Sequence, residues 1–426
     1  MLGVGTAGSV GPRPPGTTTA PAPDDGDPDA RERDAWTILT AVDHLGPIAF
    51  AALLARFGTG RGILAAATGP RGIEELAGTP PLDPDPDGVV RRPVPQFVAV
   101  AIVNAVHRGP ILLDRVRSLG LRAVTVNEAA YPTRAARIAM PPHVLFVLGS
   151  VDAVSRARSV AVVGTRRATT AGRTTAGRIA TALVAAESTV VSGLAYGIDG
   201  VAHEATVSAG GTTVAVIGGG HAVAVPGGHR RLARAILDAG GAIVSELAPD
   251  VEPTRGTFPR RNRIISGLAD ATVVVEAPAR SGALVTASWA LEQGRPCFLV
   301  PGPIDFHASA GCLAFLREFH GEARLVAGIP QLIADLGYAE RAGHVGPAGL
   351  AGAALQELGR TGRDVAAAML SGAATVDELV ATTDLPVATV LASLALLEGR
   401  GLVVGVHGRY RAAGALLGER ATRKPT

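Results

Sequence analysis

One basic run, residues 257–267, combines the side chains best suited to binding an anion. Arginine presents a planar fork of donors that fits phosphate, and an aromatic ring gives a nucleobase a face on which to stack. The run is predicted to be a loop between two strands. The alternative to a binding site is a solvated basic surface without a ligand. We expect a phosphate-backbone binding site, for single-stranded nucleic acid. Its candidate residues are Phe258, Arg260, Arg261, Asn262 and Arg263.

Four turns rich in glycine or small polar residues follow predicted strands and precede predicted helices. The strands of a doubly wound sheet end at one edge, where ligands bind, so the turns are expected to gather there. Helix N-termini would add free N–H groups, and glycine lets a phosphate approach the backbone. Each turn alone is more often structural, but together they predict an anion site. The residues are Gly164, Thr165, Arg166, Ser192, Gly193, Gly197, Arg280, Ser281 and Gly282, with Gly218–Gly220 as the remaining turn.

The sequence contains no complete catalytic set, which predicts a protein that is not an enzyme. None of the turns matches the dinucleotide fingerprint or the Walker pattern. Asp199 lies four residues before His203 and is better explained as a helix-capping residue. Glu276 is expected to pair with an arginine, and Ser281 has no adjacent base.

No metal or cofactor is expected either. His221 and His229 flank Pro226–Gly228 without a neighbouring carboxylate cluster. Cys297 and Cys312 are the two cysteines, and their spacing is not that of a zinc site. So few cysteines fit a protein of a reducing compartment.

Composition sets wider limits on this chain of 426 residues, in which 47% of residues are hydrophobic but 4% are aromatic. The length predicts two or three domains. A net charge of +3 is too small to indicate nucleic-acid binding by itself. We find no secretory signal and no uncharged apolar run of membrane-spanning length, and therefore expect a cytoplasmic protein without a membrane span.

The order of predicted elements indicates an α/β fold. Apolar residues in 34–120 have helical spacing, with tight turns at Leu45–Pro47 and Phe57–Gly60 and a loop insertion at Thr79–Pro95. Short β-branched runs then alternate with helices, which predicts an extended Rossmann-like parallel sheet. The strands expected are Ala123–Val126, Ser159–Val163, Ser188–Val191, Thr213–Ile217, Ala242–Val244, Ala271–Val275 and Cys297–Val300.

The C-terminal part has the pattern of a winged helix, with three helices followed by a hairpin. Thr375 and Glu378 have the spacing of a capping box. The expected recognition helix, which starts at Pro386, lacks the polar side chains that contact bases. A module that binds protein, or DNA only weakly, is therefore favoured over one that recognises a DNA sequence. The complete division is a disordered segment 1–33, a helical module 34–120, a sheet domain 121–338, a linker 339–350, a winged helix 351–414 and a basic tail 415–426.

These motifs, taken together and in this order, resemble the DprA/Smf family of DNA processing proteins. The resemblance rests on the segments Val160–Arg166, Ser192–Asp199 with His203, Ala215–Gly218, Phe258–Gly267, Val275–Ala277, Ser281–Ala287, Leu291–Arg295 and Val300–Gly302, with Tyr131-Pro132 and Pro141–Gly149 as the lead-in.

The resemblance implies a Rossmann-like core, an N-terminal helical module similar to a sterile-alpha-motif or helix-hairpin-helix fold, and a C-terminal winged helix. It implies binding and protection of incoming single-stranded DNA during natural transformation (competence), loading of the RecA recombinase, and a homodimer. Arg166 and Arg280 would hold phosphates, and the basic run would complete the pocket.

This sequence departs from the family pattern at two places. Val225 replaces a tyrosine, and Gly311–Leu316 lacks an asparagine near Leu313, which leaves dimer geometry open. The alternative function is a nucleotide phosphoribohydrolase on the same scaffold. The sequence after Pro226–His229 lacks the G-T-x-x-E that such an enzyme requires.

Overall fold

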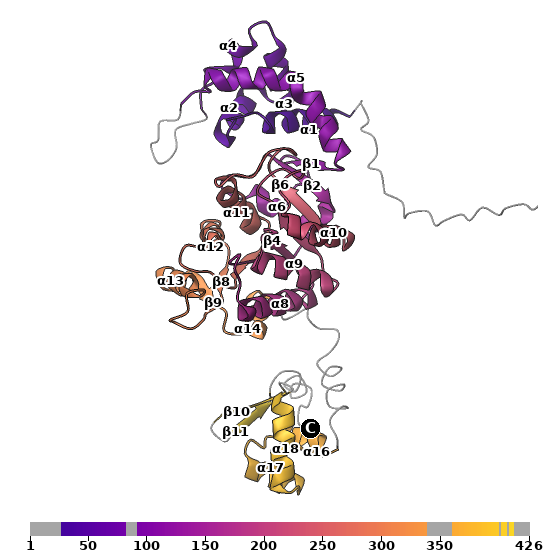
Figure 1. Cartoon of the computed structure of the whole chain (residues 1–426), viewed down its shortest axis with the longest axis vertical. Coiled ribbons are helices and arrows are strands. Elements are labelled where there is room, and N and C mark those ends of the chain that lie inside the picture. Colours follow the sequence, from indigo (N-terminus) through magenta and orange to yellow (C-terminus); the bar gives the residue numbers. More distant parts are fainter. Residues whose placement is uncertain (1–26, 82–91, 339–359, 400–401, 407–408, 413–426) are drawn as a thin grey trace, which may run out of the picture. The chain divides into compact units, whose positions relative to one another are not determined.

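A computed structural model describes residues 27–81, 92–338, 360–399, 402–406 and 409–412 (Figure 1). The chain divides into two compact units, Met1–Ile329 and Pro330–Thr426. The first helix begins at Pro28, so the prediction of disorder is wrong for residues 28–33. Residues 1–26, the linker 339–350 and the tail 415–426 lie outside the described residues.

A nine-stranded sheet forms the centre of the first unit, in the order β1-β2-β6-β5-β4-β3-β7-β8-β9. From β6 to β9 in that order the strands are parallel, whereas β2 is antiparallel to both of its neighbours. The predicted parallel sheet therefore carries an antiparallel edge. The strands are β1 (Arg122–Thr125), β2 (Val144–Gly149), β3 (Ser159–Val163), β4 (Thr189–Ser192), β5 (Thr213–Val216), β6 (Ala242–Ser245), β7 (Ala271–Val274), β8 (Cys297–Leu299) and β9 (Ala323–Leu325).

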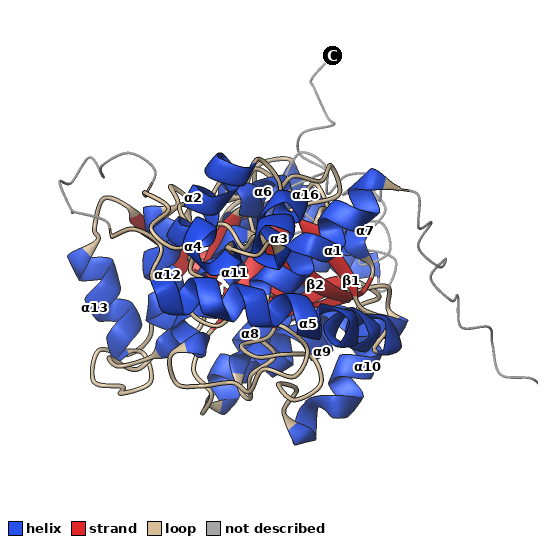
Figure 2. Ribbon diagram, turned by 90° about the horizontal axis from the view of Figure 1, so that it is seen from above, coloured by secondary structure: helices blue, strands red, loops and turns tan. Residues whose placement is uncertain are grey.

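Helices lie on both sides of this sheet (Figure 2). Successive strand residues point to opposite faces, so Val214 and Val216 join one buried cluster and Ala215 joins another. Both clusters are built largely from Ala, Val, Leu and Ile. The helices of this part are α6 (Thr133–Ala136), α7 (Val151–Val154), α8 (Thr170–Ala185), α9 (Ile198–Ser208), η1 (Gly227–His229), α10 (Arg230–Asp238), α11 (Thr257–Gly267), α12 (Gly282–Glu292), α13 (Ala310–Glu318) and α14 (Ile329–Asp335).

The N-terminal helices share their core with the sheet. On β2, Val144 and Phe146 belong to the helical cluster, whereas Leu145 and Val147 belong to the main sheet cluster. The predicted boundary at residue 120 therefore does not interrupt the hydrophobic core. These helices are α1 (Pro28–Thr40), α2 (Pro47–Phe57), α3 (Gly60–Thr68), α4 (Gly72–Leu76) and α5 (Gln96–Ser118), and the predicted turns join α1 to α2 and α2 to α3.

Helix α5 is long and apolar enough to cross a membrane, judged by length and composition alone. Two bent pairs, α2 with α3 and α17 (Val376–Thr383) with α18 (Val387–Gly399), pass the same test when each pair is taken as one span. Arg108 interrupts the apolar segment of α5, so this helix is not an uncharged run, and the absence of a membrane span stays a prediction. In the structure Val98, Ala99 and Ile102 of α5 are buried in the helical core.

The second unit contains α16 (Arg360–Leu370), α17 (Val376–Thr383), α18 (Val387–Gly399) and the antiparallel pair β10 (Val403–Val406) and β11 (Arg409–Ala412). The predicted capping box is confirmed, because Thr375 accepts from the Glu378 N–H and Glu378 accepts from the Thr375 N–H. Leu379, Val390, Leu394 and other apolar side chains form its buried cluster.

Candidate nucleic-acid interface

The strand order reverses between β3 and β7, at the centre of the sheet. The chain leaves β3 toward β4, β5 and β6, and later returns to the other side of β3 as β7. Ligands of doubly wound sheets bind at such a switch point, outside the carboxyl ends of the strands. A small cavity of about 130 Å³ lies beside this point, at the carboxyl ends of β3, β4 and β5. We call it the sheet-edge pocket; it is lined by Arg166, Gly193–Tyr196, Ile217, Gly218, Ala224, Pro226, Phe258 and Arg261.

The loop from β4 to α9 approaches the loop after β3 very closely. Gly197 has φ 85°, and a Cβ there would meet the carbonyl groups of Thr165 and Arg166. Leu194 is buried with φ 55°, a left-handed conformation that costs energy outside glycine. Thr165 connects the two loops further, because its N–H donates to Glu276 and its carbonyl accepts from Ile198. The turns after β3, β4 and β7 thus form one rigid edge.

The N-terminus of α8, where a Rossmann fold places a nucleotide phosphate, already holds an anion. The Glu276 carboxylate accepts from the Thr169 N–H at 2.9 Å and from the Thr169 hydroxyl at 2.7 Å. A Cβ at Gly172 would also meet this carboxylate. Among the described residues Glu276 forms no ion pair with an arginine, so that expectation is wrong. Its negative charge stabilises the N-terminus of α8 instead.

The other helix N-termini are not free phosphate sites either. The Ser281 hydroxyl caps α12 by accepting from the Ala283 N–H. Asp199 accepts from the N–H groups of Gly193 and Ala195, which closes the loop that precedes α9. The N–H groups of Thr169, Gly193, Ala195 and Ala283 are therefore occupied, and the exposed arginine side chains are the candidates for anion binding.

Arg261 is buried beneath the sheet-edge pocket, with 5% of its surface exposed. Its guanidinium donates to the Val216 carbonyl, and it borders Gly193 together with the Asp199 carboxylate. Burial lowers the pKa of Arg261 to about 10, so it stays charged at neutral pH. Burial raises the pKa of Asp199, while Arg261 and the nearby N–H groups oppose that rise. Arg261 therefore organises the pocket floor.

Arg166 is the exposed cation of the pocket. Its guanidinium carbon lies 5.0 Å from the centre of the Phe258 ring, in the range of a cation–π contact. The ring itself packs against Gly218, where a Cβ would collide with it. Tyr196, which we did not predict, is exposed on the pocket wall and lies 4.6 Å from the His229 ring. Its position in a glycine-rich turn of the switch point was the available signal.

The basic run forms helix α11 and not a loop, which corrects the prediction. Pro259 lies in the first turn of the helix, where proline is tolerated. Ile264 and Ile265 are buried and anchor the helix to the sheet. Helical geometry separates the arginines, so Arg260 and Arg263 border a different cavity from the one that contains Arg261.

Several other predicted residues are structural in this arrangement, or lie apart from the pocket lining. Ser192 is fully buried and donates to the Val162 carbonyl at 2.6 Å, which corrects its assignment as a contact residue. Asn262 donates to the Gly282 carbonyl at 3.0 Å and so holds the turn before α12. Gly164 packs against Ile198, and Arg280 is exposed outside the pocket lining.

His203 is buried and neutral, and the described residues contain no group of three or more potential metal ligands. Burial lowers the pKa of His203 to about 3, and His229 and Arg261 act in the same direction. His203 lies against Thr213, with 2.7 Å between its Nδ1 and the hydroxyl oxygen. Burial also lowers the pKa of His221 to about 4.

Comparison with known proteins identifies the family of this chain. A family model described as DNA recombination-mediator protein A matches residues 122–337. The chain belongs to this family. The matched segment begins at β1 and contains every element of the sheet-edge pocket.

Curated relatives and a solved structure agree with the recombination-mediator assignment. The putative DNA processing protein DprA of Mycobacterium tuberculosis (strain H37Rv) is 42% identical over 329 residues, 73% of this chain and 82% of that protein. DprA of Bacillus subtilis is 36% identical over 227 residues, 52% of this chain and 76% of that one. The X-ray structure of DprA from Streptococcus pneumoniae matches with a TM-score of 0.55 at 27% identity, covering 71% of this chain and 97% of that chain.

The resemblance to the DprA/Smf family is thereby confirmed. As a member, the chain is a DNA-binding recombination mediator and not an enzyme. This agrees with a pocket that offers arginine and aromatic surfaces.

Proposed function

We propose that this recombination mediator binds single-stranded DNA at the sheet-edge pocket. The observation that carries the proposal is the pairing of an exposed guanidinium, Arg166, with the half-exposed Phe258 ring at 5.0 Å. A phosphate requires the first and an unstacked base requires the second. The cavity is smaller than the roughly 300 Å³ of the smallest typical ligand pockets, which favours one group of a longer strand over a whole small molecule.

The wider role that we propose follows from the family. The protein protects incoming DNA in the cytoplasm during natural transformation and helps to load RecA onto it, acting as a homodimer. The C-terminal unit serves as a winged-helix module that contacts a protein. The apolar first turn of α18, which begins at Val387, supports this role over base recognition.

The test is a fluorescence-anisotropy titration of the full chain with single-stranded and duplex DNA of equal length. We expect tighter binding to single strands, little sequence preference, and an affinity that falls as salt rises, since phosphate contacts release counterions. Equal affinity for duplex, or binding that salt does not weaken, contradicts the proposal.

A further inference from the structure

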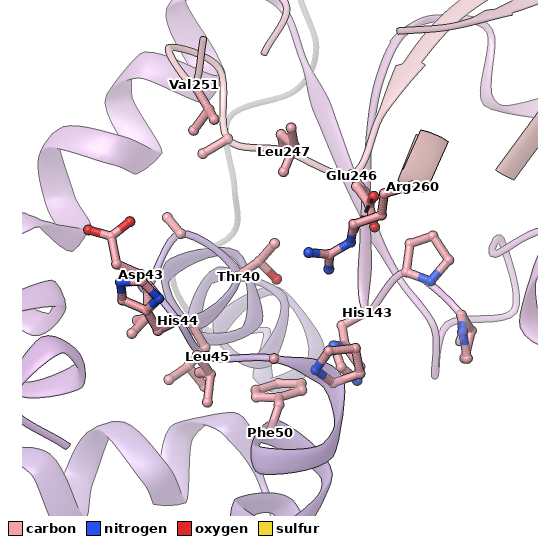
Figure 3. A pocket seen from close by; sticks show the side chains of 18 of the residues that line it. Thr40, Asp43, His44, Leu45, Phe50, His143, Glu246, Leu247, Val251 and Arg260 are labelled. Carbon is pink, nitrogen blue, oxygen red and sulfur yellow. Dashed lines mark ion pairs between the residues drawn. The ribbon is translucent and has the colours of Figure 1, made fainter. Parts of the chain in front are cut away.

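Two adjoining cavities lie on the side of α11 that faces the N-terminal helices. Their volumes are about 280 and 420 Å³, and both are lined by Pro47, Arg260 and Arg263. We call them together the module-side groove. Figure 3 shows the first cavity, in which the Arg260 guanidinium extends inward and Thr40, Phe50 and His143 lie across from it.

The arginines of this groove differ in the charge that they leave available. Arg263 is 2% exposed and donates to the Glu246 carboxylate at 2.6 Å. Arg260 lies 3.5 Å from the other oxygen of Glu246 and remains 55% exposed. Two arginines against one glutamate leave a positive charge on the exposed member. Burial lowers the pKa of His143 to about 4, so this ring is neutral; Asp43 is the other carboxylate of the lining.

The second cavity is apolar apart from these arginines. Val285 and Trp289 are four residues apart on α12 and so lie on one face of that helix. Met140 and Val285 are exposed, and the Trp289 ring is half-exposed beside them. A partly exposed aromatic ring near a guanidinium with surplus positive charge provides what one nucleotide needs: a stacking surface for the base and a partner for the phosphate.

The groove lies next to the sheet-edge pocket, with the first turn of α11 between them. Phe258 belongs to the pocket, whereas the next two residues, Pro259 and Arg260, belong to the groove. A helix with its side chains is about 10–12 Å wide, so a strand that leaves the pocket reaches the groove within a few nucleotides. The surplus positive charge at Arg260 and the short distance from the sheet-edge pocket therefore favour DNA over a peptide as the occupant of the groove.

We infer that bound single-stranded DNA crosses the first turn of α11 and continues into the module-side groove. Arg260 contacts a phosphate there, and Trp289 stacks on a base. This inference rests on the proposed function and extends it, because it assigns a second binding wall that includes the N-terminal helices.

Tryptophan fluorescence of the full chain tests the inference directly. The chain has two tryptophans, of which Trp36 is buried and Trp289 is half-exposed. We would titrate oligothymidylates of about 4 to 16 nucleotides. Short oligomers should bind without quenching, whereas longer ones should quench Trp289 and bind at least about fivefold tighter, the equivalent of one stacked base. Trp289→Phe should remove the quenching, and Arg260→Ala should remove the gain in affinity with length.

The controls separate this inference from the proposal on which it rests. Arg178→Ala removes an exposed arginine on α8, outside both linings, and should leave every affinity unchanged. If Arg166→Ala weakens binding while Arg260→Ala and Trp289→Leu behave as wild type at all lengths, the inference is wrong and the sheet-edge pocket stands. A groove that serves a protein partner gives that same result. If wild type binds no single strand, both ideas fail.

Discussion

The sheet-edge pocket and the module-side groove lie on two sides of α11 and use consecutive arginines differently. Arg261 is 5% exposed and is engaged by a carbonyl and by nearby Asp199, whereas the Arg260 side chain is 55% exposed. An arginine in a basic run can thus be a buried structural residue of a site, or it can be an exposed side chain that is available to a ligand. Burial and partners distinguish the two roles, and the sequence alone does not.

The comparison is tested most strongly by removing each arginine in turn. Arg261→Ala leaves the Asp199 carboxylate buried without its cation, and breaking a buried charge interaction costs about 3–5 kcal/mol. Arg260→Ala removes an exposed side chain and should change the free energy of unfolding by less than about 0.5 kcal/mol. Urea denaturation measures both. Equal losses in the two variants would contradict the division of roles.

Acid should lower the free energy of unfolding through two histidines that are neutral in the folded protein, His203 and His143. The folded pKa is lowered from 6.5 to about 3 at His203 and to about 4 at His143. Below pH 6.5 the unfolded chain therefore binds protons that the folded chain does not, and stability falls as pH decreases toward the folded pKa. At pH 5 each histidine should cost about 2 kcal/mol relative to pH 7.

Glutamine variants resolve the two contributions to acid sensitivity. Urea midpoints of His203→Gln and His143→Gln, measured at pH 7 and pH 5, should each change less with pH than those of wild type. A variant that keeps the full wild-type pH dependence shows that its histidine is not the group that titrates.

Arg166 should affect affinity and not stability. Arg166→Ala is expected to weaken binding of single-stranded DNA about tenfold, since charge-assisted hydrogen bonds contribute about 1.5 kcal/mol or more. It should also reduce the dependence of affinity on salt by about one phosphate contact. Anisotropy titrations beside Arg178→Ala give the measurement. A loss of folding in Arg166→Ala would assign Arg166 to the same class as Arg261.

Tyr196 gives the smallest expected effect. Its exposed ring offers a second stacking face on the pocket wall, and Tyr196→Ala should weaken single-strand binding about fivefold, at the low end for one stacked base. Tyr196→Phe retains the ring and should bind within about twofold of wild type. Equal weakening in both variants would show that the hydroxyl, which accepts from the Gly228 N–H at 3.3 Å, is the contributing group.

Sequence reasoning recovered the α/β class and every strand of the sheet except β2 and β9. β2 is buried on both faces along Val144–Val147, so it lacks the alternation that marks a strand, and β9 has only three residues. The run 257–267 was expected to be a loop because its arginines conceal the buried positions of a helix. Arg261 and Arg263 occupy such positions although their side chains are charged.

The site was predictable as a region but not in its division of roles. Glycine turns and arginines indicated one edge of the sheet, and Arg166, Gly193, Phe258 and Arg261 do line one cavity there. The role of Glu276 depended on a contact across 107 residues, which no local pattern indicates.

The carboxylate of Glu276 has a consequence for how this protein relates to metabolism. A Rossmann scaffold with an open first helix can respond to ATP or NAD, whose phosphates compete for that helix N-terminus. Here a side chain of the protein occupies that position, and displacing it would leave a buried acid without its donors. We therefore expect the affinity for single-stranded DNA to be independent of the energy charge and redox state of the cell.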